Sequence, residues 1–395
     1  MDARYAERSP AAASPGAIPP ELLPEFSDRF IGSHRLIEQY VSCLAFAVFR
    51  ELGLDELCRD GLTIEDALAR AHLLPAVALV PLQWIFATLA RQGWLRREGS
   101  GTAERFSTVA AAEVADPDSV LDLQRRLDPH ALPAFSIAQL AARHYPAVLR
   151  GERTGEEVLF AADNMGAWMD YFSNANPLYA INNTVGAHAA LRALPARPGT
   201  ILELGGGLGS GAEALLRQAE RAARRDDIAA YKFTEVVPTF LRRARGLLAE
   251  RFAGWPLTYH FLDMNAGFPE SVAAAGSVAL VYGVNVLHVA HDLSATLQSI
   301  RRVLQPGGAL AIAECMRPFE HTPLYVEFVF NLLESFRTPL RVPGWRPNGG
   351  FLTPEQWRAA LQANGFSDIV FYPDLFSIRE THPSFYVGAV MATSR

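Results

Sequence analysis

The sequence predicts an α/β fold, with a doubly wound and mostly parallel seven-stranded sheet, preceded by a helical domain of the winged-helix type. Three observations support this prediction. From residue 196 onward, apolar runs of strand length alternate with helical segments, which indicates parallel strands joined by crossover helices. A glycine-rich turn follows the first of these runs and leads into a helix. Before residue 110, apolar residues recur at three- and four-residue spacing, and a short two-stranded pattern follows them.

Composition limits the classes of protein to which the chain can belong. The 395 residues carry a formal net charge of −6, and the three cysteines, Cys43, Cys58 and Cys315, have no metal or disulfide spacing. No apolar run approaches the roughly 20 residues of a membrane span. The acidic balance disfavours a broad nucleic-acid surface, and the cysteine usage fits a reducing compartment. We therefore expect a cytoplasmic protein that binds neither membrane nor nucleic acid.

The first two segments of the chain differ in composition. Residues 1–27 are rich in Ala, Pro and Ser and lack the apolar segment of a signal peptide, so we expect a disordered leader. The pattern of residues 28–110 indicates helices followed by a two-stranded wing. These residues include nine arginines against ten acidic residues, so the basic stripe of a DNA-binding domain is missing. We expect this winged-helix-like domain to form a homodimer or to shield the substrate.

Residues 111–195 are predicted to be mostly helical, as a linker and a substrate-covering region. The stretch "NMGAWMDYFSNANPLYAINNTV" places Trp168, Tyr171 and Phe172 on one helical face. Tyr179 and Asn183 follow in an asparagine-rich turn and helix. Two interpretations stay open, namely a core face with asparagine caps or a pocket for a flat, carbonyl-bearing acceptor. In the second interpretation, these five residues contact the substrate.

The C-terminal segment, residues 196–395, contains the predicted sheet. Its strands are expected, in chain order, at 200–205, 231–237, 257–264, 277–284, 309–314, 367–373 and 384–392. Its helices are expected at 211–225, 238–252, 293–305 and 353–366. Pro238 suits the first turn of its helix, and Thr353 forms a capping box with Gln356. The last two strands are expected to add an antiparallel pair at the edge of the sheet.

The glycine-rich turn "ELGGGLGSG" indicates which kind of ligand binds there. It lacks the lysine of a phosphate-binding P-loop, and Ser210 stands where a dinucleotide fingerprint read from Gly205 needs its third glycine. A carboxylate, Glu203, instead precedes the glycines. Because this carboxylate would repel a pyrophosphate and attract a cation, the turn favours a positively charged ligand.

Further polar residues follow the next strands at the same edge of the sheet. Glu235 could accept both hydroxyls of a ribose, Asp263 could accept from an adenine amine, and Met264 could pack on the ring. A nucleoside that carries a positive charge and no phosphate is S-adenosylmethionine, which is the cofactor we expect. The candidate cofactor-binding residues are Glu203, Gly205, Gly206, Gly207, Glu235, Asp263, Met264 and Asn285.

Four motifs appear in a characteristic order: "ILELGGGLGSG", "FTEVVPTFLRRA", "FLDMNAGFP" and "LVYGVNVLHVAHDLSATLQSIRRVLQPGGALAIAE". This set resembles class I S-adenosylmethionine-dependent methyltransferases. More narrowly, roughly residues 155–375 resemble the C-methyltransferase domains of polyketide synthases and their free-standing relatives. The helical front part resembles instead the dimerisation domain of small-molecule O-methyltransferases. The resemblance implies a Rossmann-like methyltransferase fold with a lid insertion at about residues 316–350.

The resemblance also implies a catalytic dyad, because in this family a histidine after the fourth strand acts with a glutamate at the end of the fifth. The matching residues are His288 in "NVLHVAHD" and Glu314 in "AIAECM". We expect these strands to be neighbours, so both side chains would project from one edge. His288 would remove a proton from an acidic C–H or O–H, which contributes about 10²–10⁴-fold, and Glu314 would orient it. The structural alternatives are a loop histidine without a role and a glutamate that pairs with an arginine.

Two other groups of residues near the dyad have open roles. His291 and Asp292 could ligate a metal, although their compact spacing makes joint ligation awkward and Asp292 suits a helix cap better. In the lid, Arg341 could contact an acidic acceptor and Trp345 could wall its pocket. The alternative for the lid is ordinary helix packing with a solvated arginine face.

We expect a methyltransferase of secondary metabolism that uses S-adenosylmethionine. Its acceptor would be an acidic carbon, between or beside carbonyls, of a small-molecule or carrier-protein-bound acyl group. The first alternative is O-methylation of a phenol, enol or carboxyl group at the same site, which the front domain supports. The second alternative is a non-catalytic regulator that binds S-adenosylmethionine.

Overall fold

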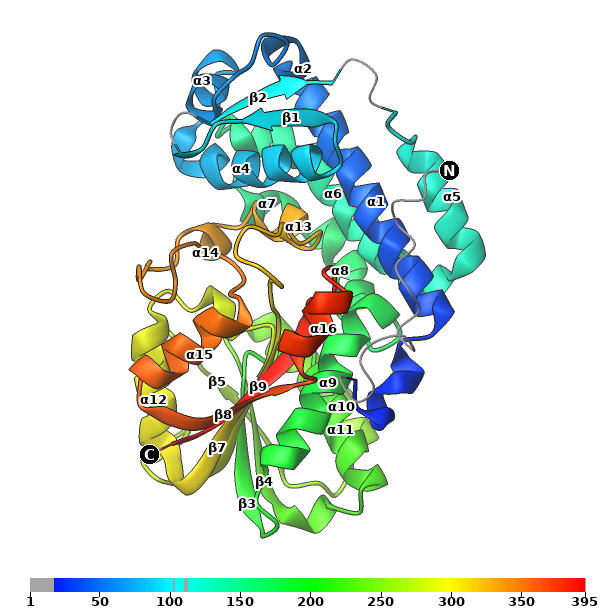
Figure 1. Ribbon diagram of the computed structural model, residues 1–395. Helices are drawn as coiled ribbons and strands as arrows, with labels where there is room; N and C mark the ends of the chain where they lie inside the picture. Colours follow the sequence, from blue (N-terminus) through cyan, green and yellow to red (C-terminus); the bar gives the residue numbers. More distant parts are fainter. Residues whose placement is uncertain (1–17, 102–103, 110–112, 395) are drawn as a thin grey trace.

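The computed structural model describes residues 18–101, 104–109 and 113–394. Its N-terminal unit contains four α-helices and a two-stranded antiparallel hairpin. The hairpin lies with α2, α3 and α4 at one end of the molecule, and α1 runs from that end along its side (Figure 1). The elements are α1 (Asp28–Glu51), α2 (Leu54–Leu57), α3 (Ile64–Arg70), α4 (Pro75–Arg91), β1 (Leu95–Glu98) and β2 (Arg105–Thr108). A hairpin after three or more helices is the predicted winged-helix-like arrangement, which is thereby confirmed.

The predicted leader is wrong in its last third. Residues 1–17 lie outside the described residues, but Pro20–Glu25 form a 3-10 helix that packs on the rest of the chain. Leu22 is fully buried, and Glu21 pairs with Arg192 and accepts a hydrogen bond from Tyr372 at 3.0 Å. Composition alone did not reveal these contacts, because they join the start of the chain to segments far away in the sequence.

The segment between the N-terminal unit and the sheet is helical, as predicted. It contains α5 (Pro117–Leu127), α6 (Leu132–Leu149), α7 (Gly155–Leu159), α8 (Met165–Tyr171) and α9 (Pro177–Ala193). Three short 3-10 turns also occur in the described N-terminal half, at Pro20–Glu25, Pro129–Ala131 and Ala162–Asn164. Within the described residues, none of the helices combines the length and the apolar character that a membrane span requires.

The sheet has seven strands in the order β5-β4-β3-β6-β7-β9-β8. The strands are β3 (Gly199–Leu204), β4 (Ile228–Glu235), β5 (Leu257–Phe261), β6 (Val278–Val284), β7 (Leu304–Cys315), β8 (Phe366–Tyr372) and β9 (Val387–Ser394). Strands β3 to β7 pair in parallel, and β9 is antiparallel to both β7 and β8. The doubly wound, mostly parallel sheet is therefore confirmed, and so is the antiparallel pair at its edge.

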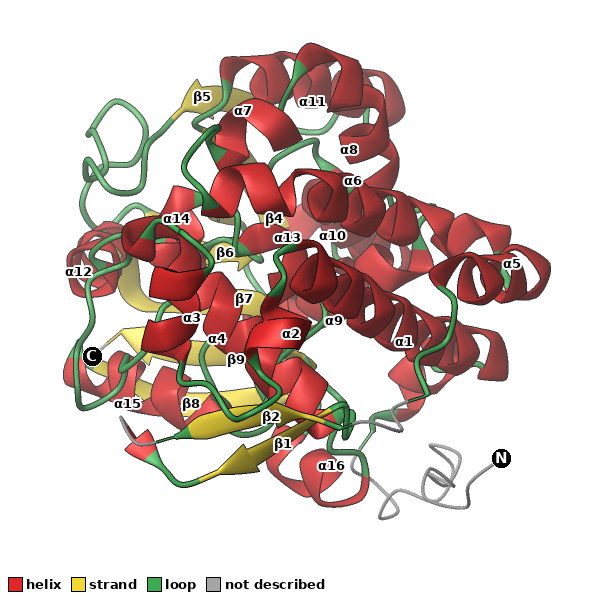
Figure 2. Ribbon diagram, turned by 90° about the horizontal axis from the view of Figure 1, so that it is seen from above, coloured by secondary structure: helices red, strands yellow, loops and turns green. Residues whose placement is uncertain are grey.

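Helices cover both faces of the sheet (Figures 1 and 2). One face packs against α9, α10 (Ser210–Arg221) and α11 (Pro238–Arg251), and the other packs against α12 (Leu293–Val303), α15 (Pro354–Ala363) and α16 (Leu375–Thr381). Ile201 of β3 faces the first set, whereas its neighbour Leu202 faces the second, as the two-residue period of a strand requires. The central strands are thus buried on both sides, which explains their continuous apolar sequences.

The helix ends follow the predicted signals. Pro238 begins α11, and Thr353 with Gln356 forms both hydrogen bonds of a capping box at α15. The side chain of Asp292 accepts a hydrogen bond from the backbone N–H of Ala295 at 3.0 Å and so caps α12. The cap fixes where α12 begins, which in turn fixes the short loop between it and β6.

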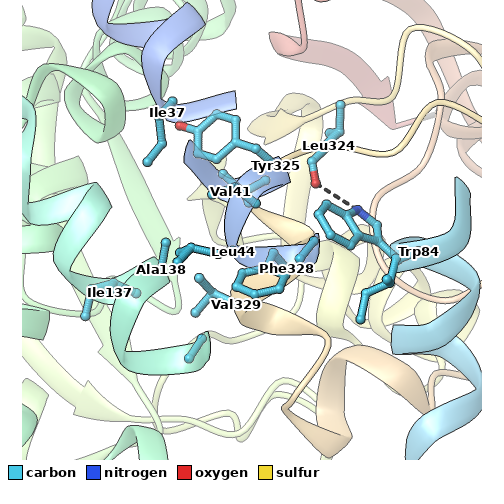
Figure 3. Packing of buried hydrophobic residues seen from close by; sticks show 14 of the residues in the cluster. Ile37, Val41, Leu44, Trp84, Ile137, Ala138, Leu324, Tyr325, Phe328 and Val329 are labelled. Atoms are coloured by element: carbon cyan, nitrogen blue, oxygen red, sulfur yellow. Dashed lines mark hydrogen bonds between the residues drawn. The ribbon is translucent and has the colours of Figure 1, made fainter. Parts of the chain in front are cut away.

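The lid, residues 316–350, shares a hydrophobic core with the N-terminal helices. It contains two short helices, α13 (Glu327–Phe330) and α14 (Glu334–Arg337), which lie between the N-terminal unit and the sheet (Figure 1). The indole N–H of Trp84 donates to the carbonyl of Leu324 at 3.0 Å (Figure 3). Tyr145 donates to the carbonyl of Phe328 at 2.6 Å and stacks on its ring at 4.5 Å. Residues of this shared core include Ile37, Val41, Leu44, Ile137, Ala138, Tyr325 and Val329 (Figure 3).

Candidate active site

A cavity of about 240 Å³ lies at the carboxyl ends of the central strands. The chain reverses its direction of strand addition at β3 and β6, and the crevice outside such a switch point is where open α/β sheets bind ligands. Residues of the glycine turn, of α8 and α9, of the loop after β6 and of the lid line this cavity. We therefore build the candidate site from these segments.

The glycine turn brings bare backbone to the floor of the cavity. Gly205, Gly207 and Gly209 have positive φ angles of 57°, 57° and 91°, which L side chains rarely adopt. A side-chain carbon on Gly205 would also lie 2.3 Å from Cγ2 of Val286, and one on Gly206 would lie 2.2 Å from the ring of Phe233. Close packing against Val286 and Phe233 thus requires glycine at positions 205 and 206.

Two carboxylates flank this turn. Glu203 is 1% exposed and accepts a hydrogen bond from the hydroxyl of Tyr231 at 3.0 Å. Its burial raises the pKa of Glu203 to about 8. Glu235, the last residue of β4, accepts backbone hydrogen bonds from Gly207 at 2.8 Å and Val237 at 2.7 Å, although burial still raises its pKa. Both side chains line the cavity and are suited to a ligand with a positive charge or hydroxyl groups.

Two predicted cofactor residues lie outside the cavity, and a third lines it but has a structural contact of its own. Asp263 and Met264 do not line the cavity, because β5 ends at Phe261 and the chain then turns. Asp263 accepts from the backbone N–H of Asn265 at 2.9 Å, and Met264 packs against the core on the other face of the sheet. Asn285 does line the cavity, but its Oδ1 accepts from the backbone N–H of Cys315 at 2.8 Å, so its side chain joins two strand ends.

His288 and Glu314 form a buried hydrogen-bonded pair. The His288 Nδ1 and Glu314 Oε2 atoms are 2.6 Å apart, and the two residues are 5% and 0% exposed. Glu314 is the next-to-last residue of β7. His288 lies in a 3-10 turn, Leu287–Val289, and follows the last residue of β6 by four positions. Because β6 and β7 are neighbours, their ends bring the two side chains together, as the sequence predicted.

The other oxygen of Glu314 holds the backbone of the histidine turn. Its Oε1 accepts from the backbone N–H groups of Val286, Leu287 and His288 at 3.1, 2.8 and 3.3 Å. A carboxylate that accepts an Nδ1–H leaves the Nε2 atom of the imidazole without a proton. His288 lines the cavity, and the rings of Phe336 and Phe351 pack beside it, at 5.7 and 4.4 Å between centroids. The geometry thus suits a general base.

The predicted substrate residues divide into two groups. Tyr171, Phe172, Tyr179 and Asn183 line the cavity. Trp168 does not, because it is fully buried and donates its indole N–H to the carbonyl of Leu159 at 2.7 Å. Helical spacing correctly grouped the aromatic residues, but Trp168 belongs to the core behind Phe172, against which it stacks at 5.2 Å.

The two lid residues predicted to contact the acceptor do not line the cavity. Arg341 lines a separate cleft of about 370 Å³ between the N-terminal unit and the lid, and Trp345 packs into the core beneath α15. Arg346 is fully buried and donates to the backbone carbonyls of Ala290, at 2.8 Å, and of His288. Arg346 therefore supports the histidine turn, and burial lowers its pKa to about 10.

Two other residues of the cavity wall were not predicted from the sequence. Phe351 and Tyr386 line it together with the predicted residues. Tyr386 has a signal in hindsight, since it directly precedes β9, whose antiparallel pairing brings its start to the carboxyl end of β7. No group of three or more His, Cys, Asp or Glu side chains within the described ranges converges as metal ligands.

Comparisons with known proteins agree with this geometry. Residues 202–310 match the family model of a methyltransferase domain. The chain is 26% identical over 342 residues to highly reducing polyketide synthase 2 of Gibberella zeae, an alignment that covers 81% of this chain but only 13% of that synthase. The fold matches the crystal structure of the CurJ carbon methyltransferase with a TM-score of 0.72, at 20% identity over 91% of this chain and 92% of that one.

A second solved structure was determined with the demethylated cofactor product. It is the trans-methyltransferase CalH in complex with S-adenosylhomocysteine, which matches with a TM-score of 0.60 at 19% identity, over 92% of each chain. The match to a methyltransferase domain covers the glycine turn and the carboxylates Glu203 and Glu235 that flank it. Residues 202–310 match a methyltransferase domain, and the whole chain has the fold of the carbon-methyltransferase domains of polyketide synthases.

Proposed function

We propose that the protein methylates an acidic carbon of a β-carbonyl acyl group during polyketide biosynthesis. The observation that carries this proposal is the buried His288–Glu314 pair in the wall of the cavity that contains the glycine turn. Oxygen acceptors with low pKa values need little help from a base, whereas a carbon acid needs a positioned one. A small-molecule or carrier-bound acyl chain is the proposed acceptor.

The residues around the glycine turn fit S-adenosylmethionine. Glu203 would face the cationic part of the cofactor, Glu235 the ribose hydroxyls, and Gly205, Gly206 and Gly207 would allow its close approach. When bound, the cofactor supplies a methyl group that is already activated as a sulfonium. What remains for this chain is to hold both molecules in position and to prepare the nucleophile.

Proton removal is the step that the His288 geometry supports. The Nε2 atom takes the proton from the acceptor carbon, and the electron pair of that C–H bond stays on the acceptor as an enolate. The imidazole becomes an imidazolium whose Nδ1–H donates to Glu314 at 2.6 Å. The carboxylate stabilises this charge, and the aromatic walls formed by Tyr171, Phe172 and Phe351 exclude water.

Isotope-labelled methyl transfer tests the proposal. The purified protein is incubated with a donor that carries a trideuteromethyl group and with β-ketoacyl thioesters of N-acetylcysteamine, and NMR locates the new methyl group. A methyl group on the carbon between the carbonyls is expected, and methyl ether or ester products would replace the proposal by O-methylation. A control reaction with His288→Ala should lose at least about a hundredfold in rate. Binding of S-adenosylhomocysteine without any transfer would favour a regulator.

A further inference from the structure

A buried hydrogen-bond acceptor in the cavity wall has no donor. Asn183, in the second turn of α9, is fully buried and lines the cavity. Its Oδ1 receives no hydrogen bond from any residue in the described ranges. Because buried side-chain oxygens are rarely left without a partner, this atom indicates a ligand that brings a donor.

The orientation of the Asn183 amide is fixed by its neighbours. Asn174 uses its Nδ2 to donate to the carbonyl of Ser210 at 2.9 Å and to Glu213 at 3.4 Å, and both of these are acceptors only. The Oδ1 of Asn174 must therefore be the atom that faces Asn183, and it accepts from the Asn183 Nδ2 at 2.8 Å. The remaining atom of Asn183, aimed away from this network, has to be the oxygen.

This oxygen and a carboxylate oxygen lie around the same point. A side-chain carbon built on Gly211 would lie 3.1 Å from Glu203 Oε1 and 3.7 Å from Asn183 Oδ1. Glu203 uses its other oxygen to accept from Tyr231. Two acceptors thus meet beside a glycine, one of them a carboxylate, and the Asn183 oxygen has no donor within the described residues. A positively charged group with several N–H bonds complements this pair.

We propose that Asn183, together with Glu203, binds the α-ammonium group at the amino-acid end of S-adenosylmethionine. The inference rests on the proposed cofactor and deepens it. It also replaces the role expected for Asn183 from the sequence, which was contact with the acceptor. Asn183 thereby becomes a residue that makes the site selective for a nucleoside with an amino-acid tail.

Calorimetry with two ligands tests this assignment without turnover. The ligands are S-adenosylhomocysteine and its desamino analogue, in which hydrogen replaces the α-ammonium group. The wild-type protein should prefer S-adenosylhomocysteine by about 10- to 100-fold, the range for hydrogen bonds to a charged group. Asn183→Leu should reduce this preference at least about fivefold, with the affinity for the desamino analogue within about threefold of wild type.

Asn176→Leu is the matched control. Asn176 directly precedes the first residue of α9, is 1% exposed and has an Oδ1 without a donor among the described residues, but it does not line the cavity. This variant should keep the wild-type preference. If Asn183→Leu weakens both ligands equally, or if Asn176→Leu also removes the preference, the assignment is wrong.

A second variant covers the case in which Asn183→Leu does not fold. Asn183→Asp keeps an acceptor at the same place, so it should retain the preference for the ammonium-bearing ligand, and loss of that preference would overturn the inference. The two proposals fail in different ways. A wild-type protein that binds neither ligand contradicts the proposed cofactor, whereas one that binds both ligands equally contradicts only the role of Asn183.

Discussion

Replacing Glu314 by Gln tests the proposed base most sharply. The carboxylate has two oxygens with separate duties, since Oε1 accepts from three backbone N–H groups and Oε2 accepts from His288 Nδ1. A glutamine can keep the first set only by pointing its oxygen at the backbone. Its NH2 group then faces Nδ1, so the imidazole must carry its proton on Nε2 and cannot act as a base.

The expected loss follows from this change of tautomer. General-base catalysis contributes about 10²–10⁴-fold, and the related Asp-to-Asn change in a Ser-His-Asp triad costs about 10⁴-fold. A loss in this range corresponds to about 3–5.5 kcal/mol of transition-state stabilisation. The affinity for S-adenosylhomocysteine should stay within about threefold of wild type, because neither residue belongs to the proposed cofactor contacts.

Solvent exchange measures the proton step by itself. In D2O, with S-adenosylhomocysteine bound, wild-type protein should accelerate deuterium uptake at the acceptor carbon, and Glu314→Gln should reduce the rate to the level of His288→Ala. The double variant should be no slower than either single one, since the two residues act as a unit. Exchange and turnover by Glu314→Gln within about tenfold of wild type, with cofactor-product binding intact, would refute the tautomer argument.

Three other predictions concern the cofactor turn and the lid. At pH 7, Glu203 with its pKa near 8 should release close to one proton when S-adenosylhomocysteine binds, and this release should appear as a buffer-dependent binding enthalpy that Glu203→Gln abolishes. Because the pKa is raised in the folded chain, the stability that this group contributes is present below about pH 4.5 and is lost as the pH rises to about 8. Denaturation of Glu203→Gln should lack this dependence of the free energy of unfolding on pH. Gly205→Ala should weaken binding at least about tenfold and lower the free energy of unfolding by about 1–3 kcal/mol, because its Cβ meets Val286, whereas Gly207→Ala, with the same φ of 57° and open space around its Cβ, should lose less in both calorimetry and denaturation. Arg341→Ala should change kcat/KM for the acceptor by less than about threefold, since it lines a different cleft, and a larger loss in steady-state assays would return Arg341 to the acceptor site.

The elements that could be predicted are those whose signals are local. The alternation of strands and helices, the glycine turn after Glu203 and the cap at Asp292 each depend on a few consecutive residues and the physics of their backbone. The pairing of His288 with Glu314 was implied by the resemblance to a known family, and it agrees with the rule that parallel neighbours present their carboxyl ends at one edge of the sheet.

The errors share a different origin. Whether Trp168 or Tyr171 faces a cavity depends on which side of a helix meets the core, and helical spacing alone does not determine this. Asp263 lies beyond the last residue of its strand, where the direction of a side chain follows from the turn and not from the strand period. Arg341 lies in an irregular part of the lid, where no helix or strand period determines the direction of a side chain.

The core shared by the lid and the N-terminal helices limits how this protein can be transplanted. Trp84 of α4 donates a hydrogen bond to the carbonyl of Leu324, and Tyr145 of α6 donates one to the carbonyl of Phe328. Both helices precede the sheet in the chain. A chimeric synthase that exchanged the sheet alone would leave its lid without the scaffold on which it is built. Successful junctions in an engineered assembly line should therefore lie before Pro20 and after β9, so that the N-terminal helices, the lid and the sheet are transferred together.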